Sequence, residues 1–371
     1  MYRMMKPNFF TLSIIGCLFG TLSHAHVITG DSTEIDTSDN NAKKLYINNY
    51  TGDEVIDVPA GYTEVYVTGY AKIAPYSNTS RSVYALSNST VEVNGDVSVK
   101  NLQAQVGVTD SNTNISGNAT VSTMLAIAES SNTFRIGGTL NINAFSRSFI
   151  ANGSSVYAGD VLIKKATLGM HIAGNVYTNS FTTSAATTTF QKGSLLSSLN
   201  SATVGKLLIQ SGSTVDCLGT IELETELQGG KFSLQEAATV SDVTMQSGTF
   251  MVLGNAQTGD LTLNAGDIIF SENTHMDLNG GVLHCDSGVN ISLTVDNINQ
   301  LGNKIVLFEN VSSASVLPDD FTVTVSDKTD SISLNVTMQG GAIVLNIPEP
   351  VTTSLTACGL ALLLMRRRRK R

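Results

Sequence analysis

Apolar and polar residues alternate along most of this chain, and glycines followed by turn-forming polar residues interrupt the alternation at intervals. A period of two is typical of half-buried β-strands, because successive side chains of a strand point to opposite faces. Between residues 90 and 265 the pattern recurs as VEVNGDVSV, TNISGNATV, FRIGGTLNI, SVYAGDVLI, MHIAGNVYT, VDCLGTIEL and AQTGDLTL. We expect each glycine to let the chain turn through an unusual φ angle.

The spacing of these glycines indicates a structural repeat. Their separations are 22, 21, 21, 15, 45 and 40 residues, so the first three are nearly constant and only the fourth breaks the rule. About 21 residues make one coil of a β-solenoid, in which each coil buries its apolar residues by stacking on the next. The glycines concerned are Gly95, Gly117, Gly138, Gly159, Gly174, Gly219 and Gly259.

The predicted fold is therefore all-β, with right-handed parallel β-helix or β-solenoid repeats over residues 90–300. Roughly 13 coils at about 4.8 Å each between residues 30 and 300 would form a rod about 60 Å long. Capping strands are expected at both ends, in 26–89 and 301–346, because an open coil exposes unpaired strand edges. A β-sandwich is the alternative. The glycine-strand rhythm resembles the passenger repeats of autotransporter adhesins, although the residues after 300 are too few for that family's membrane translocator.

Composition and charge agree with this fold and restrict the partners. Hydrophobic residues make up 42% of the chain, charged residues 14%, and Trp is absent, which favours strands and turns over helices. The formal net charge is −9, but eight of the 22 basic residues lie in the two end segments, which are expected to be removed. Residues 27–347 hold 14 Lys plus Arg and 30 Asp plus Glu, a net charge of −16. Nucleic acid and anionic membranes are therefore not expected partners.

The N-terminus has the layout of a secretory signal peptide. Two basic residues precede an apolar stretch over 9–22, and the triplet SHA places small residues where signal peptidase reads them. We expect residues 1–25 to be the signal peptide and cleavage to follow Ala25. An alternative is the lipobox-like sequence IIGC, which would make Cys17 a lipidated N-terminus.

The C-terminus, IPEPVTTSLTACGLALLLMRRRRKR, combines a Pro-Glu-Pro motif, an apolar run over 351–365 and a basic cluster. Residues 347–371 closely resemble the PEP-CTERM sorting signal. The resemblance implies recognition by an exosortase, a membrane-embedded protease-transpeptidase of Gram-negative bacteria with exopolysaccharide systems. The residues that carry the signal are Pro348, Glu349, Pro350, Arg366, Arg367, Arg368 and Arg369.

Membrane physics predicts the same orientation. A 15-residue helix rises about 22 Å, short of a hydrocarbon core of about 30 Å, so the segment 351–365 is a marginal transmembrane span that suits a temporary anchor. Basic residues stay on the cytoplasmic side, which places the body outside. We expect export, transient anchoring in the inner membrane, and then a cell-surface or extracellular location. A permanently tail-anchored periplasmic protein is an alternative.

Several residues are candidates for chemistry. The residues that follow the glycines are expected to form a ladder at one corner of the solenoid. Their side-chain oxygens could coordinate calcium. The same residue types are favoured in turns because they form local hydrogen bonds, and this is the interpretation we prefer. Arginines are candidates for clamping a sugar acid. The ladder positions are Asp96, Asn118, Thr139, Asp160, Asn175, Thr220 and Asp260, and the arginines are Arg81, Arg135 and Arg147.

His284 and Asp286 would share one face of a strand, with Cys285 opposite, so a His-Asp pair or a metal site is conceivable there, together with His275. The alternative is that His284 and Asp286 are simply two polar side chains on the solvent-facing side of a strand. Cys217 and Cys285 could form a disulfide in an oxidising compartment, or remain two buried thiols.

Catalytic signatures are missing from the sequence, which has no Ser-His-Asp motif, phosphate loop or zinc-type spacing. We therefore expect no cofactor and a non-enzymatic structural or adhesive role at the cell surface or in the extracellular matrix. The expected partners are signal peptidase, the exosortase, and extracellular polysaccharide or the cell envelope. A secreted β-helix polysaccharide lyase or glycoside hydrolase is the alternative.

Overall fold

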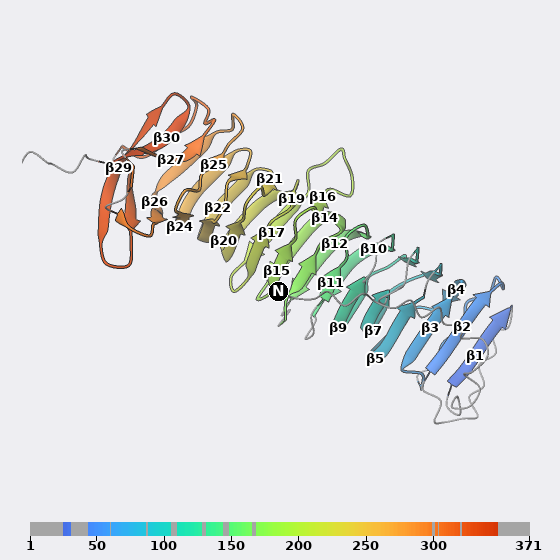
Figure 1. Ribbon diagram of the computed structural model, residues 1–371. Coiled ribbons are helices and arrows are strands. Elements are labelled where there is room, and N and C mark those ends of the chain that lie inside the picture. The colour runs from blue at the N-terminus through green and yellow to red at the C-terminus, as the bar shows by residue number, and fades with distance from the viewer. Residues whose placement is uncertain are drawn as a thin grey trace, which may run out of the picture.

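The computed structural model is a long parallel β-solenoid of about 12 turns (Figure 1). It describes residues 25–30, 44–59, 61–86, 88–104, 110–127, 131–143, 148–164, 168–298, 301–302, 304–319 and 321–347. This part contains thirty strands and no helix, so the solenoid prediction is confirmed and the β-sandwich alternative is wrong.

The strands follow one another with short connections. In chain order they are β1 Ala25–Gly30, β2 Lys44–Tyr50, β3 Glu64–Thr68, β4 Tyr70–Ile73, β5 Tyr76–Ala85, β6 Thr90–Val93, β7 Val97–Ala104, β8 Asn112–Ile115, β9 Ala119–Ile127, β10 Thr133–Ile142, β11 Ser148–Ile150, β12 Ser155–Lys164, β13 Met170–Ile172, β14 Asn175–Ser184, β15 Thr187–Phe190, β16 Leu195–Ser197, β17 Lys206–Gln210, β18 Thr214–Cys217, β19 Thr220–Ile221, β20 Glu224–Leu234, β21 Thr239–Val240, β22 Val243–Val252, β23 Ala256–Gln257, β24 Leu261–Ser271, β25 Met276–Asp277, β26 Leu283–Thr294, β27 Lys304–Glu309, β28 Thr322–Ser326, β29 Ser331–Gln339 and β30 Ala342–Asn346.

Each coil crosses three faces, and every face is a parallel ladder. Face 1 runs from β1, β2 and β3 through the second halves of β5, β7 and β9 to β28. Face 2 runs from β4, β6 and β8 through the first halves of β10, β12 and β14 to β27. Face 3 contains the first halves of β5, β7 and β9 and the second halves of β10, β12 and β14, and ends at β26.

The apolar positions of the alternation point inward on all three faces and form one continuous core. Phenylalanines stack between successive coils, as Phe232 and Phe250 do with ring centroids 5.5 Å apart. Phe270 and Phe308 meet edge to face at 5.2 Å. Burying one such side chain contributes about 1.5–3 kcal/mol, and because no coil can supply this burial alone, the coils are stable only as a stack.

The N-terminal strands extend the solenoid itself. β1, β2, β3 and β5 pair in parallel along face 1, in the same manner as the coils that follow. On face 1 this parallel pairing continues past residue 90, from β5 to β7. The reason is that KLYINNY and EVYVT alternate with the same period as the later strands, so they stack on the repeats as further coils.

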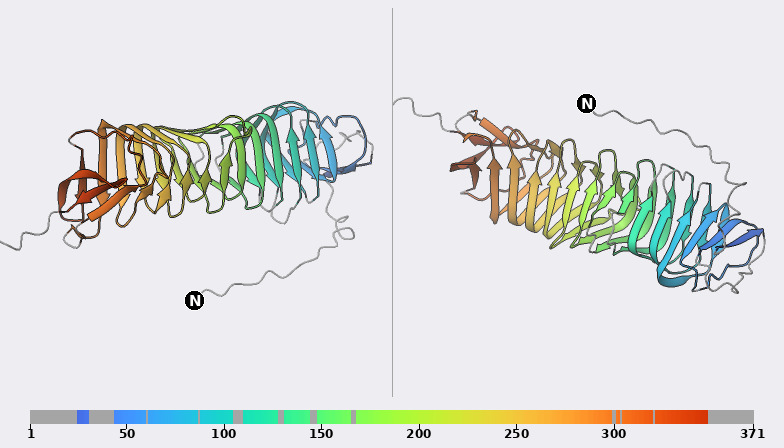
Figure 2. Two further views of the ribbon diagram at one scale, coloured as in Figure 1. Left: turned by 90° about the horizontal axis from the view of Figure 1, so that it is seen from above. Right: turned by 60° about the horizontal axis from the view of Figure 1, so that its bottom comes forward.

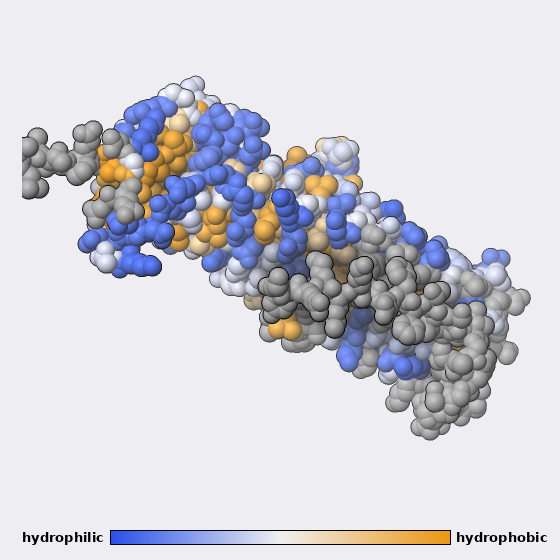
Figure 3. All heavy atoms as spheres, viewed as in Figure 1, coloured by the Kyte–Doolittle hydropathy of each residue, from blue (hydrophilic) through white to orange (hydrophobic). Residues whose placement is uncertain are grey.

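The C-terminal strands close the other end. β29 pairs antiparallel with β28 and with β30, and β30 pairs antiparallel with β27, so a hairpin joins the last strand of face 1 to the last strand of face 2. Figure 2 shows these red strands crossing the end of the rod. Hydrophilic residues cover much of the visible surface, and a hydrophobic patch lies over this end, around β27 (Figure 3).

The repeated glycines permit close stacking between coils. Of the seven, only Gly95 has a positive φ, so the expectation of an unusual φ at each is wrong. A Cβ added at Gly117 would lie 2.6 Å from the carbonyl carbon of Gly95, and one at Gly159 would lie 3.1 Å from the carbonyl oxygen of Gly138. These glycines therefore exclude a side chain where one corner packs directly on the next.

The irregular interval of 15 residues also has a structural cause. Gly159 lies between face 2 and face 3, since it separates the two halves of β12. Gly174 precedes β14, at the corner between face 1 and face 2, where a Cβ would lie 2.5 Å from the carbonyl oxygen of Ser154. The two glycines belong to different corners, so the 15 residues between them do not correspond to the length of one coil.

The two sorting elements expected at the termini lie outside the described residues. Residues 1–24, which hold most of the expected signal peptide, and residues 348–371, which hold the Pro-Glu-Pro motif, the expected span and the arginines, are not among the described residues. Within the described ranges, no helix is both long and apolar enough to cross a membrane.

Candidate functional site

The predicted ladder is present at the corner between faces 2 and 3, where its side chains mainly accept hydrogen bonds from backbone N–H groups of the next coil. The carboxylate of Asp96 accepts hydrogen bonds from the backbone N–H of Asn118 at 2.7 Å and from its side chain at 3.1 Å. Asn118 in turn accepts the backbone N–H of Thr139 at 2.8 Å, and Asp160 accepts the hydroxyl of Ser180 at 2.6 Å. The same relay joins Asp242 to Asp260 at 2.8 Å farther along. One oxygen of each of these side chains is thus engaged in hydrogen bonds at the corner, as expected of turn residues.

Two ladder positions lie elsewhere. Asn175 and Thr220 begin the face 2 strands β14 and β19, and the structure does not bring them to the corner column. Within the described residues, no group of three or more His, Cys, Asp or Glu side chains is arranged to hold a metal ion.

The histidines form isolated pairs. The Nε2 of His284 lies 3.1 Å from the Oδ1 of Asp286, and both side chains are exposed, so the expectation that they share a face is correct. His275, directly before β25, pairs instead with Glu309 of β27 at 2.8 Å, near the C-terminal end of the rod. Among the described residues, neither pair belongs to a group of three or more His, Cys, Asp or Glu side chains that could hold a metal ion.

The two cysteines are separate buried thiols. Cys217 lies on face 1 and Cys285 on face 3, and no disulfide joins them. Burial raises the pKa of each thiol to about 12, so both remain protonated at neutral pH. They act as small core side chains.

Arg81 is a structural residue. It is 1% exposed, its Nε donates to the carbonyl of Tyr62 at 3.0 Å, and its Nη2 donates to the carbonyls of Val58 at 3.1 Å and Pro59 at 2.7 Å. Its guanidinium also lies 4.8 Å from the ring centroid of Tyr76. Arg81 is therefore unable to clamp an external sugar acid. Arg147 lies outside the described residues.

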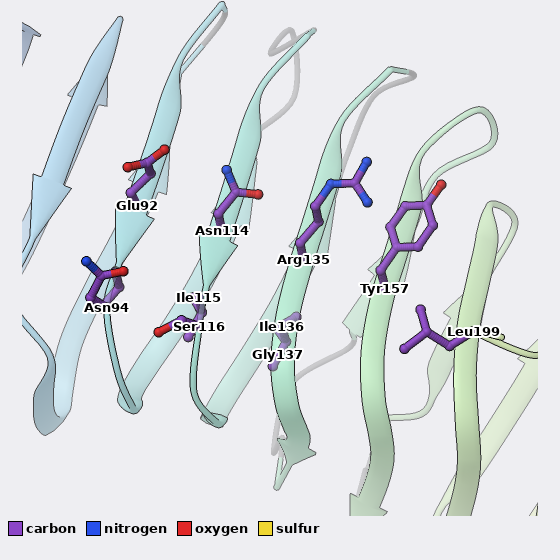
Figure 4. A pocket seen from close by; sticks show the side chains of 11 residues that line it. Glu92, Asn94, Asn114, Ile115, Ser116, Arg135, Ile136, Gly137, Tyr157 and Leu199 are labelled. Carbon is purple, nitrogen blue, oxygen red and sulfur yellow. The ribbon is translucent and has the colours of Figure 1, made fainter.

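Arg135, the third candidate, lies exposed on face 2 in a column of outward-facing side chains. Parallel pairing places Glu92, Asn114, Arg135 and Tyr157 at equivalent positions on β6, β8, β10 and β12. Figure 4 shows them side by side on successive strands. The Arg135 guanidinium lies 4.3 Å from the Tyr157 ring centroid, and that ring stacks on Tyr177 at 4.7 Å.

A hollow of about 500 Å³ opens along this column. Its lining adds to the column the corner residues Asn94, Ser116 and Gly137 and the side chain of Leu199. The volume lies within the range of about 300–1,000 Å³ that is typical of ligand sites, but the shallow shape suits an extended ligand better than an enclosed one.

Two departures from the repeat meet at this hollow. The corner between faces 2 and 3 shortens by one residue, because Gly137 and Gly138 of β10 face the single Gly159 of β12. The loop 198–205 is inserted between β16 and β17 at the same corner, and it carries Leu199. Insertions in solenoids commonly mark the binding face, so the hollow is the strongest candidate for a functional site.

Other surface features are weaker candidates. A hollow of about 440 Å³ on face 3 is lined by acidic and polar side chains, and its Lys206 is paired with Glu226 at 2.7 Å. On face 1, Tyr46, Tyr66 and Tyr84 stack with ring centroids 4.9 and 4.7 Å apart. Their ring faces cover one another, so they mainly stabilise the ladder.

The fold and the groove together define a non-globular β-solenoid with a groove of mixed polar and apolar lining on one face. Comparison of the chain with protein-family models, curated proteins and solved structures gives no match.

Proposed function

We propose that this protein is an exported, non-enzymatic component of the cell surface or extracellular matrix, in which the solenoid is a rigid spacer that attaches to extracellular polysaccharide. The observation that carries the proposal is the parallel stack, closed by a hairpin at its C-terminal end, with an open groove along face 2. Such a stack resists bending and presents side chains at regular intervals, which suits a structural or adhesive role.

The targeting part of the proposal depends on the two termini. The signal-peptide layout supports export, and the similarity of residues 347–371 to a PEP-CTERM signal supports cleavage by an exosortase after transient anchoring. The mature body then carries a net charge of −16 over residues 27–347, which suits a protein that stays dispersed in a hydrated matrix.

The proposal is tested on protein purified from the native host. Intact-mass measurement should give a chain that lacks residues 1–25 and the C-terminal arginines, and fractionation should find it at the surface or in the matrix. Co-sedimentation with extracellular polysaccharide from the same cells should retain the body. A full-length cytosolic chain, or a body that never sediments with the polysaccharide, contradicts it; release of unsaturated or reducing ends would favour the enzyme alternative.

A further inference from the structure

The groove on face 2 contains a cation with free hydrogen-bonding capacity. Arg135 is exposed, and no described carboxylate lies within ion-pair distance of it. Its guanidinium lies 4.3 Å from the ring centroid of Tyr157, and the Arg135 side chain lines the hollow. A planar fork of donors held in this way matches the two oxygens of a carboxylate.

The neighbouring positions offer groups that bind hydroxyls. Asn114, one coil before Arg135, presents an amide that both donates and accepts. Glu92, one coil earlier, accepts the Tyr70 hydroxyl at 2.7 Å with one carboxylate oxygen, which orients the group and leaves the other oxygen available. At about 4.8 Å per coil, Glu92 lies about 10 Å from Arg135 along the axis. The groove thus runs from the Glu92 carboxylate, which can accept hydrogen bonds from ligand hydroxyls, to the Arg135 guanidinium, which can donate to a ligand carboxylate.

The far wall and the floor suit the ring of a sugar. Leu199 is 41% exposed and stands beside Tyr157, so an apolar surface faces the hollow next to the guanidinium (Figure 4). Gly137 contributes no side chain to the floor. Sugar rings combine apolar C–H faces with a rim of hydroxyls, and this lining offers a counterpart to both.

From these contacts we infer that the hollow binds a hexuronate residue of an acidic polysaccharide, with Arg135 pairing with its carboxylate, and Asn114 and Glu92 with its hydroxyls. The inference rests on the proposed attachment to polysaccharide and names the class of sugar.

The acidic body gives this site an unusual dependence on salt. A polyanion approaching residues 27–347 is repelled over a Debye length of about 30 Å at 0.01 M salt but only about 8 Å at 0.15 M. The contact between Arg135 and a carboxylate is too short to be screened to the same degree. Affinity should therefore rise between these salt concentrations, opposite to the behaviour of ordinary cationic sites.

The experiment measures binding of a short oligogalacturonate to the purified mature body by calorimetry, beside its methyl ester and a neutral glucan oligosaccharide. Arg135→Gln should weaken oligogalacturonate binding about 10- to 100-fold, since a charge-assisted bidentate contact is lost. Lys164→Gln is the matched control, because Lys164 is an exposed cation on face 3 outside the hollow. It should leave the affinity unchanged.

The outcomes separate this inference from the proposed function. Equal binding of oligogalacturonate and its methyl ester, or equal losses in both variants, overturns the assignment of Arg135 while attachment to polysaccharide stands. Absence of oligogalacturonate binding overturns the hexuronate inference, and the co-sedimentation experiment then decides separately whether the body binds polysaccharide at all.

Discussion

Arg81 should stabilise the N-terminal coils through three carbonyls, and replacement by Met tests this. Met preserves most of the side-chain volume but cannot donate. The carbonyls of Val58, Pro59 and Tyr62 would each lose a donor that lies 2.7–3.1 Å away in the native protein. At about 1 kcal/mol for each lost hydrogen bond, Arg81→Met should cost about 3 kcal/mol.

Arg135→Met is the control for this value. Both arginines lie over a tyrosine ring, Arg81 at 4.8 Å and Arg135 at 4.3 Å, so both substitutions remove a cation–π contact. Arg135 is exposed and has no carbonyl acceptors in the described structure, so its replacement should cost less than about 1 kcal/mol. The difference between the two variants isolates the carbonyl hydrogen bonds.

The assay combines urea unfolding with hydrogen exchange read by mass spectrometry, because a repeat array can open locally without unfolding throughout. We expect faster exchange in residues 56–86 of Arg81→Met and native exchange in Arg135→Met. Equal unfolding midpoints and equal exchange in the two variants would refute the assignment of a stabilising role to the carbonyl contacts.

Three further predictions concern packing, pH and thiols. Gly137→Ala should destabilise the protein measurably in urea, because a Cβ would collide with the carbonyl oxygen of Ser116, whereas Gly61→Ala, with open space around it, should not. Asp327 accepts three backbone N–H bonds, which hold its pKa well below the usual range; its stabilisation is present above about pH 4 and lost as the pH falls, so the stability difference between wild type and Asp327→Asn should shrink in acid unfolding scans. Cys217 and Cys285 should resist iodoacetamide at neutral pH in the folded protein and react after unfolding, as read by mass; rapid alkylation of the native protein would contradict their burial.

The solenoid could be predicted because its causes are local. Alternation sets which residues point inward, and an interval of about 21 residues sets the size of a coil, so both can be read without knowing any contact. The role of the glycines could not be read in this way. A positive φ and a close approach both require glycine, and only the stacked corners distinguish Gly95 from Gly117.

The groove was only partly predictable. Arg135 was a candidate from its charge, but Arg81 was an equal candidate, since the sequence does not show that the carbonyls of Val58, Pro59 and Tyr62 bind it in the interior. Tyr157 and Leu199 were missed. The signal for Tyr157 was its place in the same outward position as Arg135 one repeat later. No comparable signal existed for Leu199, because the inserted loop 198–205 has no repeat equivalent.

The hairpin that closes the C-terminal end makes the two ends of the rod unlike. Among the described strands, β1 pairs only with β2, so one edge of that strand has no partner in this part of the chain, whereas β28 and β27 are both satisfied by the hairpin. Within the described residues, strand pairing between two copies of the rod would therefore use the free edge of β1 rather than the C-terminal end, where the hairpin already pairs with β27 and β28.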